Sequence, residues 1–213
     1  MRTDDLVALL ATGVEPVPRH AVGRRYAVAL FLGMAASAML MLGLLGLRPD
    51  LAQAVRLPMF WVKLGFVACL AWAGLLATWR LSRPGKRLDG VPIALVTPVL
   101  AMWIMAGAAL AGAPPIERPE LIFGTTWKSC PWLIALLSLP IFFAVFWAMR
   151  GQAPTQLPLA GTAAGLLAGT VGALVYCLHC PELQAPFVGT WYLVGMLIPG
   201  LFGALLGPRL LRW

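Results

Sequence analysis

Six long apolar runs, none of which contains Asp or Glu, constrain the fold of this chain more than any other feature. Each is long enough to cross the hydrocarbon core of a bilayer as a helix, which takes about 17–25 residues. The runs are continuous rather than alternating, and lipid offers the backbone no hydrogen-bond partner, so helices are expected and a strand barrel is excluded. The sequence predicts an all-α bundle of six transmembrane helices at residues 26–47, 59–79, 91–112, 131–149, 157–177 and 188–207.

Composition excludes the main soluble classes. Hydrophobic residues make up 61% of the chain and charged residues only 11%, less than half the charged share of an ordinary soluble domain. A soluble enzyme, a disordered tail and a disulfide-framework secreted domain are therefore excluded. The net charge of +8 would suggest nucleic acid as a partner in a soluble protein. Here the membrane explains the charge better, and no direct nucleic-acid binding is expected.

The basic residues divide unequally between the two sides of the predicted bundle. One side carries 11 of them: Arg2, Arg19, Arg24, Arg25, Arg80, Arg83, Lys86, Arg87, Arg150, Arg209 and Arg212. The other carries 5: Arg48, Arg56, Lys63, Arg118 and Lys128. The positive-inside rule places the richer side, with both termini, in the cytoplasm. We predict a multi-pass protein of a bacterial inner membrane, with a cytoplasmic amphipathic arm (residues 1–25) before the membrane domain (residues 26–213).

Motifs that would indicate catalysis or ion-coupled transport are absent from the sequence. There is no phosphate-binding loop, no zinc-protease motif and no nucleophile elbow. Proton-coupled transport normally needs an acid within the membrane, and the runs contain none. We therefore expect a non-enzymatic protein with no catalytic residue and no bound cofactor. A small-solute transporter remains an alternative.

Lys63 is the only charge well inside a run. It lies near the predicted outer end of the second run, where a lysine stem is long enough to extend to the lipid headgroups. An interfacial lysine is the first interpretation. The second is an ion pair with a loop carboxylate such as Glu182.

Three of the four cysteines are expected at one level of the bundle. Cys69 lies inside the second run and is interpreted as a small apolar packing residue. Cys130 precedes the fourth run, and Cys177 and Cys180 follow the fifth, so all three fall at the non-cytoplasmic surface. That surface faces an oxidising compartment in a bacterium. A permanent disulfide, a redox- or metal-responsive thiol set and a catalytic C-x-x-C of a quinone-linked thiol oxidoreductase are the open interpretations.

The residues beside these cysteines bear on the choice. His179 and Glu182 lie beside the cysteines and could complete a soft-metal site of three sulfurs and one nitrogen. The ligands named first for such a site are Cys130, Cys180 and His179. Cys177 closes a predicted helix, where the helix dipole disfavours a thiolate, and this counts against catalysis. Cys130 opens a helix and is the better candidate for a reactive thiol.

The cytoplasmic arm begins with an amphipathic segment. Asp4 and Asp5 suit the positive end of a short helix, and Leu6, Leu9 and Leu10 form an apolar stripe at helical spacing. Helices that lie on a membrane usually have a basic polar face, whereas this one is acidic. It therefore fits a basic groove on a partner protein better. Docking on its own bundle or on lipid is the alternative.

Two further features have a structural and a functional interpretation. Arg83, Lys86 and Arg87 connect the second and third runs and are expected to set the topology, with a second partner contact as the alternative. Small residues recur along single faces of the last two runs, and we expect them to let these helices approach closely. They are Gly161, Gly165 and Gly169 in the fifth run and Gly195, Pro199, Gly203 and Gly207 in the sixth.

A series of short motifs, taken in order, resembles the NrsF family of six-span bacterial membrane proteins, the negative regulators of sigma F. The motifs are Thr3-Asp4-Asp5-Leu6, Phe60-Trp61-Val62-Lys63, Arg83-Pro84-Gly85, Cys130-Pro131, Cys180-Pro181-Glu182 and Trp191-Tyr192. Together they cover nearly the whole chain.

The resemblance implies an anti-sigma factor that holds an extracytoplasmic-function sigma factor at the inner membrane. It also implies release on a heavy-metal or oxidant signal through two periplasmic-side cysteines, which correspond to Cys130 and Cys180. It assigns no role to Cys177 or His179. The resemblance does not identify the residues that grip the sigma factor, so the arm is our own inference.

Overall fold

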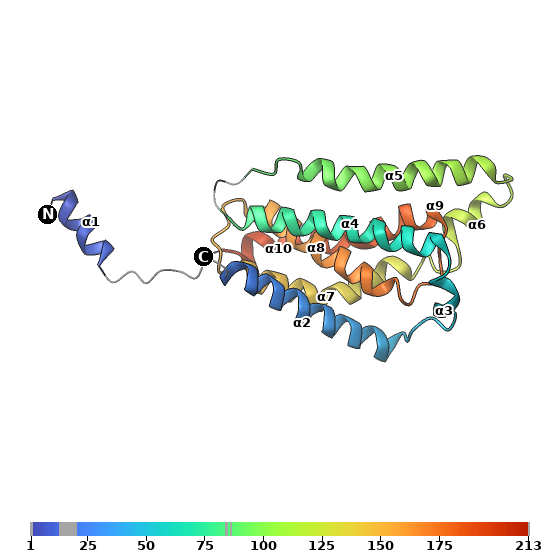
Figure 1. Ribbon diagram of the computed structural model, residues 1–213, viewed down its shortest axis with the longest axis horizontal. Coiled ribbons are helices and arrows are strands. Elements are labelled where there is room, and N and C mark those ends of the chain that lie inside the picture. Colours follow the sequence, from blue (N-terminus) through green and yellow to red (C-terminus); the bar gives the residue numbers. More distant parts are fainter. Residues whose placement is uncertain (1, 13–20, 84, 86, 213) are drawn as a thin grey trace.

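The computed structural model describes residues 2–12, 21–83, 85 and 87–212. Within these ranges every regular element is helical, and six helices are long and apolar enough to cross a membrane. The all-α, six-helix prediction is confirmed. The six are α2 (Ala21–Leu44), α4 (Pro58–Leu81), α5 (Val91–Gly112), α7 (Cys130–Met149), α8 (Leu157–Tyr176) and the continuous stretch Ala185–Leu210 (Figure 1).

The first helix starts and ends earlier than predicted, at Ala21 and Leu44, and the last extends beyond its predicted bounds at both ends. α2 begins at Ala21 rather than at residue 26. The last stretch starts with α9 (Ala185–Phe187), continues through a π-helical turn, η1 (Val188–Tyr192), and ends as α10 (Leu193–Leu210). Pro186 lies in the first turn of α9, a position where proline suits a helix start because its missing N–H needs no partner there. The middle four helices agree with the prediction within two residues at each end.

α8 is the central helix of the bundle. Of the six long helices it is the most buried, with 78% of the residues in its most apolar 18-residue stretch inside the protein. The least buried is α5, with 11%. A Cβ atom added at Gly165 would lie 2.1 Å from the Pro199 carbonyl oxygen, and one at Gly161 would lie 2.1 Å from that of Gly203. The backbones of α8 and α10 therefore touch, and the prediction that these glycines serve close packing is confirmed.

A chain of hydroxyl groups joins α2 to the far end of α4. Ser82, just after α4, donates a hydrogen bond to the Thr78 carbonyl at 2.7 Å. The Tyr26 hydroxyl, in the second turn of α2, bonds to the Ser82 hydroxyl. Tyr26 is 2% exposed and Ser82 is 1% exposed, so these bonds lie inside the bundle. They fix the start of α2 against the end of α4.

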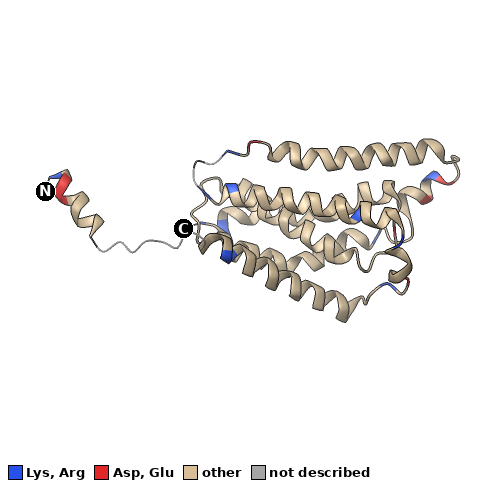
Figure 2. Ribbon diagram, in the orientation of Figure 1, with Lys and Arg blue, Asp and Glu red and all other residues tan. Residues whose placement is uncertain are grey.

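The charged residues lie mainly toward the two ends of the bundle, and the middle of the ribbon is almost free of them (Figure 2). The end that holds the start of α2 also holds the 82–90 loop (Figure 1). The opposite end holds α3 (Leu51–Ala54), α6 (Arg118–Phe123) and α9. The three cysteines of interest and Lys63 lie at this second end.

Candidate thiol site and partner arm

Three cysteines meet in one buried cluster. Cys130 is the first residue of α7, Cys177 caps the end of α8, and Cys180 lies in the loop that follows, residues 178–184. All three are 0% exposed and belong to the same group of packed side chains. They share one level of the bundle, as expected, but they are buried beneath the surface instead of lying on it. The 178–184 loop contacts Arg48 and Lys63 at this end of the bundle. Which side of the membrane this end faces stays a prediction.

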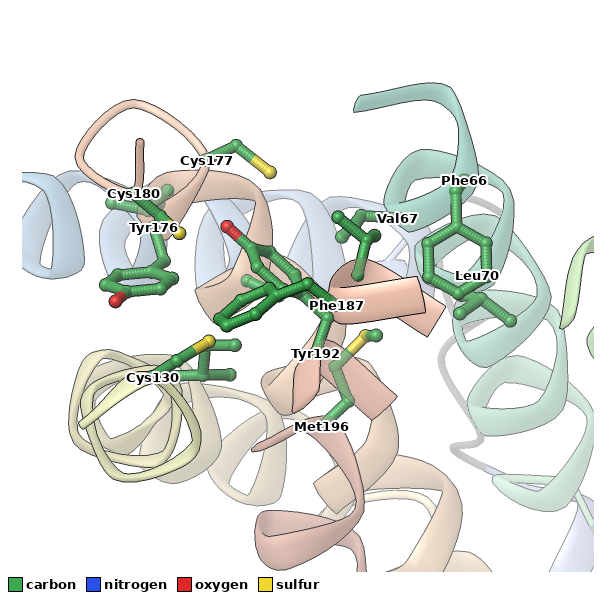
Figure 3. Close-up of a cluster of buried hydrophobic side chains, with 14 of the residues drawn as sticks. Phe66, Val67, Leu70, Cys130, Tyr176, Cys177, Cys180, Phe187, Tyr192 and Met196 are labelled. Atoms are coloured by element: carbon green, nitrogen blue, oxygen red, sulfur yellow. The ribbon is translucent and has the colours of Figure 1, made fainter. Parts of the chain in front are cut away.

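The structure pairs Cys130 with Cys180. Both are free thiols and belong to the same buried group of side chains. Figure 3 shows the two sulfur atoms on facing sides of the cluster, with the Cys177 sulfur pointing away from Cys130. We call Cys130 and Cys180 the thiol pair. Although Cys177 and Cys180 are close in the sequence, the sulfur that faces Cys180 in the cluster is that of Cys130.

The Lys63 ammonium lies close to Cys180. The neighbouring Cys130 side chain and the Lys63 ammonium lower the pKa of Cys180, against the effect of burial. We expected Cys130 to be the more reactive thiol because it opens a helix. This stays a prediction, and the structure places Cys130 as the first residue of α7.

Lys63 is fully buried beside the thiol pair. Its side chain is 0% exposed, and Nζ donates hydrogen bonds to the carbonyl oxygens of Cys180 at 3.1 Å and Glu182 at 2.9 Å. The ammonium also lies 4.8 Å from the ring centroid of Tyr192. The interfacial-lysine interpretation was wrong, because the side chain turns into the bundle. The contact with Glu182 exists but uses its main-chain carbonyl, and the described residues place no carboxylate within ion-pair distance of Lys63.

A second buried cation holds the same loop. Arg48 follows α2 and is 6% exposed. Its backbone N–H donates to the Leu178 carbonyl at 3.2 Å, and its guanidinium donates to the Cys180 carbonyl at 3.3 Å. Asp50 pairs with the same guanidinium at 2.6 Å, which lowers the pKa of the Asp50 carboxyl group. The Cys180 carbonyl is thus shared by two cations.

His179 and Glu182 are used by the loop rather than by the sulfurs. His179 Nδ1 forms a hydrogen bond with the Gly46 carbonyl at 3.0 Å. The Glu182 carboxylate accepts hydrogen bonds from the N–H and the hydroxyl of Thr125, both at 2.8 Å. No three His, Cys, Asp or Glu side chains come together as metal ligands anywhere in the described ranges. The soft-metal site that adds His179 to the cysteines is therefore not assembled.

Cys69 differs from its expected role. It lies on α4 but is exposed on the outer face of the bundle, whereas we expected it to pack in the interior. Every face of α4 is apolar, so the sequence does not show which side faces inward. Cys69 does not belong to the buried cluster that holds the thiol pair and serves as a control cysteine.

The partner arm contains one described helix, α1 (Thr3–Ala11). Asp4 and Asp5 lie in its first turn, and the Asp5 carboxylate accepts a hydrogen bond from the Arg2 backbone N–H at 3.3 Å. Every residue of α1 is exposed, including the stripe of Leu6 at 40%, Leu9 at 67% and Leu10 at 65%. The bundle therefore does not cover this apolar stripe (Figure 1).

The other candidate partner contact is the 82–90 loop. The Arg83 guanidinium lies 4.9 Å from the ring centroid of Trp79. Arg87 and Asp89 form an exposed ion pair at 3.6 Å. Lys86 lies outside the described residues. The described part of the loop thus offers exposed cations at the end of the bundle where α2 begins.

Comparison with known proteins decides the family. The sequence profile of the family described as "Negative regulator of sigma F" (NrsF) matches residues 10–213. The chain belongs to the NrsF family. A "Probable anti-sigma-F factor NrsF" from Azospira oryzae is 57% identical over 213 residues, and the "Anti-sigma-F factor NrsF" from Caulobacter vibrioides is 43% identical over 225 residues. Both similarities span the full length of the two chains compared. No solved structure matches this NrsF sequence.

Sequence reasoning missed two residues that shape the thiol site of this NrsF family member. From the sequence, Arg48 counted only among the basic residues of one side, yet it is buried and its guanidinium donates a hydrogen bond to the Cys180 carbonyl. Tyr192 appeared only as part of a motif, yet its ring lies under Lys63 and is fully buried in the same cluster. An arginine directly after an apolar run and a tyrosine within one were the available signals, and neither indicated a contact with the cysteines.

Proposed function

We propose that this chain is an integral inner-membrane anti-sigma factor whose thiol pair controls release of an extracytoplasmic-function sigma factor. Family membership supports the anti-sigma role. The observation that carries the sensory role is the buried pairing of Cys130, on α7, with Cys180, in the loop after α8. The protein acts as a binding regulator rather than as an enzyme.

Closing the thiol pair requires movement. A disulfide holds its two sulfurs about 2.05 Å apart, closer than two free thiols approach. We expect this approach to shift the first turn of α7 or the 178–184 loop. Close-packed helices respond to such shifts by changing between discrete arrangements rather than by gradual deformation. A change at this end can thus alter the opposite end, where the partner is held.

Two classes of signal fit the chemistry of the thiol pair. A peroxide would oxidise it to a disulfide. A thiophilic metal ion would be bound transiently by both sulfurs, with loss of the thiol protons. Both reactions link α7 to the 178–184 loop, and neither needs a resident cofactor.

The sigma factor would be held on the cytoplasmic side by the arm. A sigma factor is a DNA-binding protein and carries basic surfaces for the phosphate backbone. The acidic first turn of α1 and its uncovered leucine stripe suit a basic, partly apolar groove. Arg83 and Arg87 provide a second contact for acidic residues of the same partner.

Purification from a mild detergent with the co-purifying proteins identified by mass spectrometry tests the proposal. The reduced wild-type chain should retain a sigma factor in near-stoichiometric amount. Hydrogen peroxide or Cd²⁺, applied in separate arms, should lower retention at least tenfold. No sigma factor on a folded, reduced chain would refute the anti-sigma role.

Cysteine variants test the sensor in the same assay. Cys130→Ser and Cys180→Ser should each retain the sigma factor after peroxide or Cd²⁺, because neither a disulfide nor two-sulfur ligation can form. Cys69→Ser is the matched control and should respond like the wild type, since Cys69 is exposed and does not belong to the buried cluster that holds the pair. A normal response in both Cys130→Ser and Cys180→Ser would show that the signal is sensed elsewhere.

A further inference from the structure

Lys63 is a buried cation whose hydrogen bonds are made to the loop that carries Cys180. An isolated ammonium is costly to remove from water unless it is paired or hydrogen-bonded. The partners of Lys63 are the two carbonyl oxygens of Cys180 and Glu182 and the face of the Tyr192 ring. With no carboxylate nearby among the described residues, its burial depends on these groups.

The two sulfurs of the thiol pair are held by different parts of the bundle. Cys180 is tied to α4 through Lys63, by a bond to its own carbonyl. Cys130 belongs to α7, which packs mainly against α2 and α8. We expect that bringing the sulfurs to bonding distance moves Cys180 relative to Lys63 or moves α7 relative to its neighbours.

We propose that Lys63 is a positioning residue that holds the thiol pair open in its reduced state. This inference rests on the proposed function, because it assigns to Lys63 the regulation of the same thiol pair. The oxidation is Cys130–SH + Cys180–SH + ROOH → Cys130–S–S–Cys180 + ROH + H₂O, with a peroxide as the two-electron acceptor. We expect closure to displace the Cys180 backbone from the ammonium, so that a buried charged donor loses an acceptor. This penalty opposes the closed state and sets how strong an oxidant must be.

The position of Lys63 also connects the thiol pair to the other end of α4. Lys63 lies in the second turn of α4, and Thr78 and Ser82 lie at its far end, where Ser82 bonds to Tyr26 of α2. α2 follows the arm in the chain. Release of Lys63 from the Cys180 carbonyl would free α4 to shift. Because Tyr26 at the start of α2 is hydrogen-bonded to Ser82 at the end of α4, such a shift would reach α2.

The redox equilibrium of the purified chain, measured without any partner, tests the inference. The chain carries Cys69→Ser and Cys177→Ser so that only the thiol pair remains. It is equilibrated in detergent with mixtures of reduced and oxidised glutathione, where one oxidised glutathione closes the pair and yields two reduced glutathiones. The disulfide fraction is measured by alkylation and intact mass.

Lys63→Met should shift this equilibrium toward the disulfide at least tenfold, because the open state loses its hydrogen bonds. Lys63→Arg, which keeps the charge and the donors, should stay within threefold of the parent. Lys128→Met is the matched control and should leave the equilibrium unchanged, since Lys128 is an exposed lysine two residues before Cys130. If Lys63→Met does not fold, Lys63→Gln replaces it, with the same expected direction.

An unchanged equilibrium, or a shift toward the thiols, would overturn the inference. If Lys63 only supported the fold, Lys63→Met would lower the thermal stability of the oxidised and reduced forms equally. The thiol–disulfide equilibrium would then stay unchanged. The measurement needs no sigma factor. A tenfold shift in a chain that binds none would leave the inference standing and refute the proposed function alone.

Discussion

Removal of residues 1–12 should release the sigma factor while the six-helix bundle stays folded and inserted. All of α1 is exposed, so its loss removes no buried contact from the bundle. An isolated helix of nine residues is marginal in water, and a partner groove would supply the missing stabilisation. We expect retention of the sigma factor to fall at least tenfold in the detergent purification, with unchanged yield and elution of the membrane chain.

Point variants separate the leucine stripe from the length of the arm. Leu6→Ser with Leu10→Ser should reproduce most of the loss, because both side chains belong to the uncovered stripe. Ala8→Ser with Ala11→Ser is the matched control on the opposite side of the helix and should retain the partner. Full retention by the truncated chain would refute the arm assignment. It would leave family membership intact, since the family match begins only at residue 10.

Gly165→Ala should destabilise the bundle by about 3 kcal/mol or more, at the upper end of what overpacking causes. The added Cβ would lie 2.1 Å from the Pro199 carbonyl oxygen, 2.8 Å from its carbonyl carbon and 2.9 Å from Gly200 Cα. All three are backbone atoms, so relief requires α8 and α10 to separate. The change in the free energy of unfolding is measured by an unfolding titration in mixed detergent.

Gly107→Ala is the matched control for this substitution. Gly107 also lies within a long helix, α5, and an added Cβ there meets nothing within 4 Å. The free energy of unfolding should change by less than about 1 kcal/mol, the scale of helix propensity. Equal effects at Gly165 and Gly107 would mean that the α8–α10 contact does not limit stability.

The sequence by itself determined the six helices and the contact between the last two. Apolar runs of this length have one stable backbone conformation in lipid, because only a helix satisfies its own hydrogen bonds. Small residues at helical spacing, such as Gly161 and Gly165, then mark where backbones approach. Cys130 and Cys180 were placed at the same level for a similar reason, since both lie at run ends on one side.

Only the tertiary structure decided which side chains meet in the thiol site. In a helix that is apolar on every face, the pattern does not reveal the buried side, so Cys69 was expected inside and lies outside. Lys63 was expected at the lipid headgroups because nothing in the sequence shows the 178–184 loop folding back. That loop brings the carbonyls of Cys180 and Glu182 to the ammonium. The thiol site therefore depends on the path of one short loop, which is fixed by contacts between residues more than 100 positions apart.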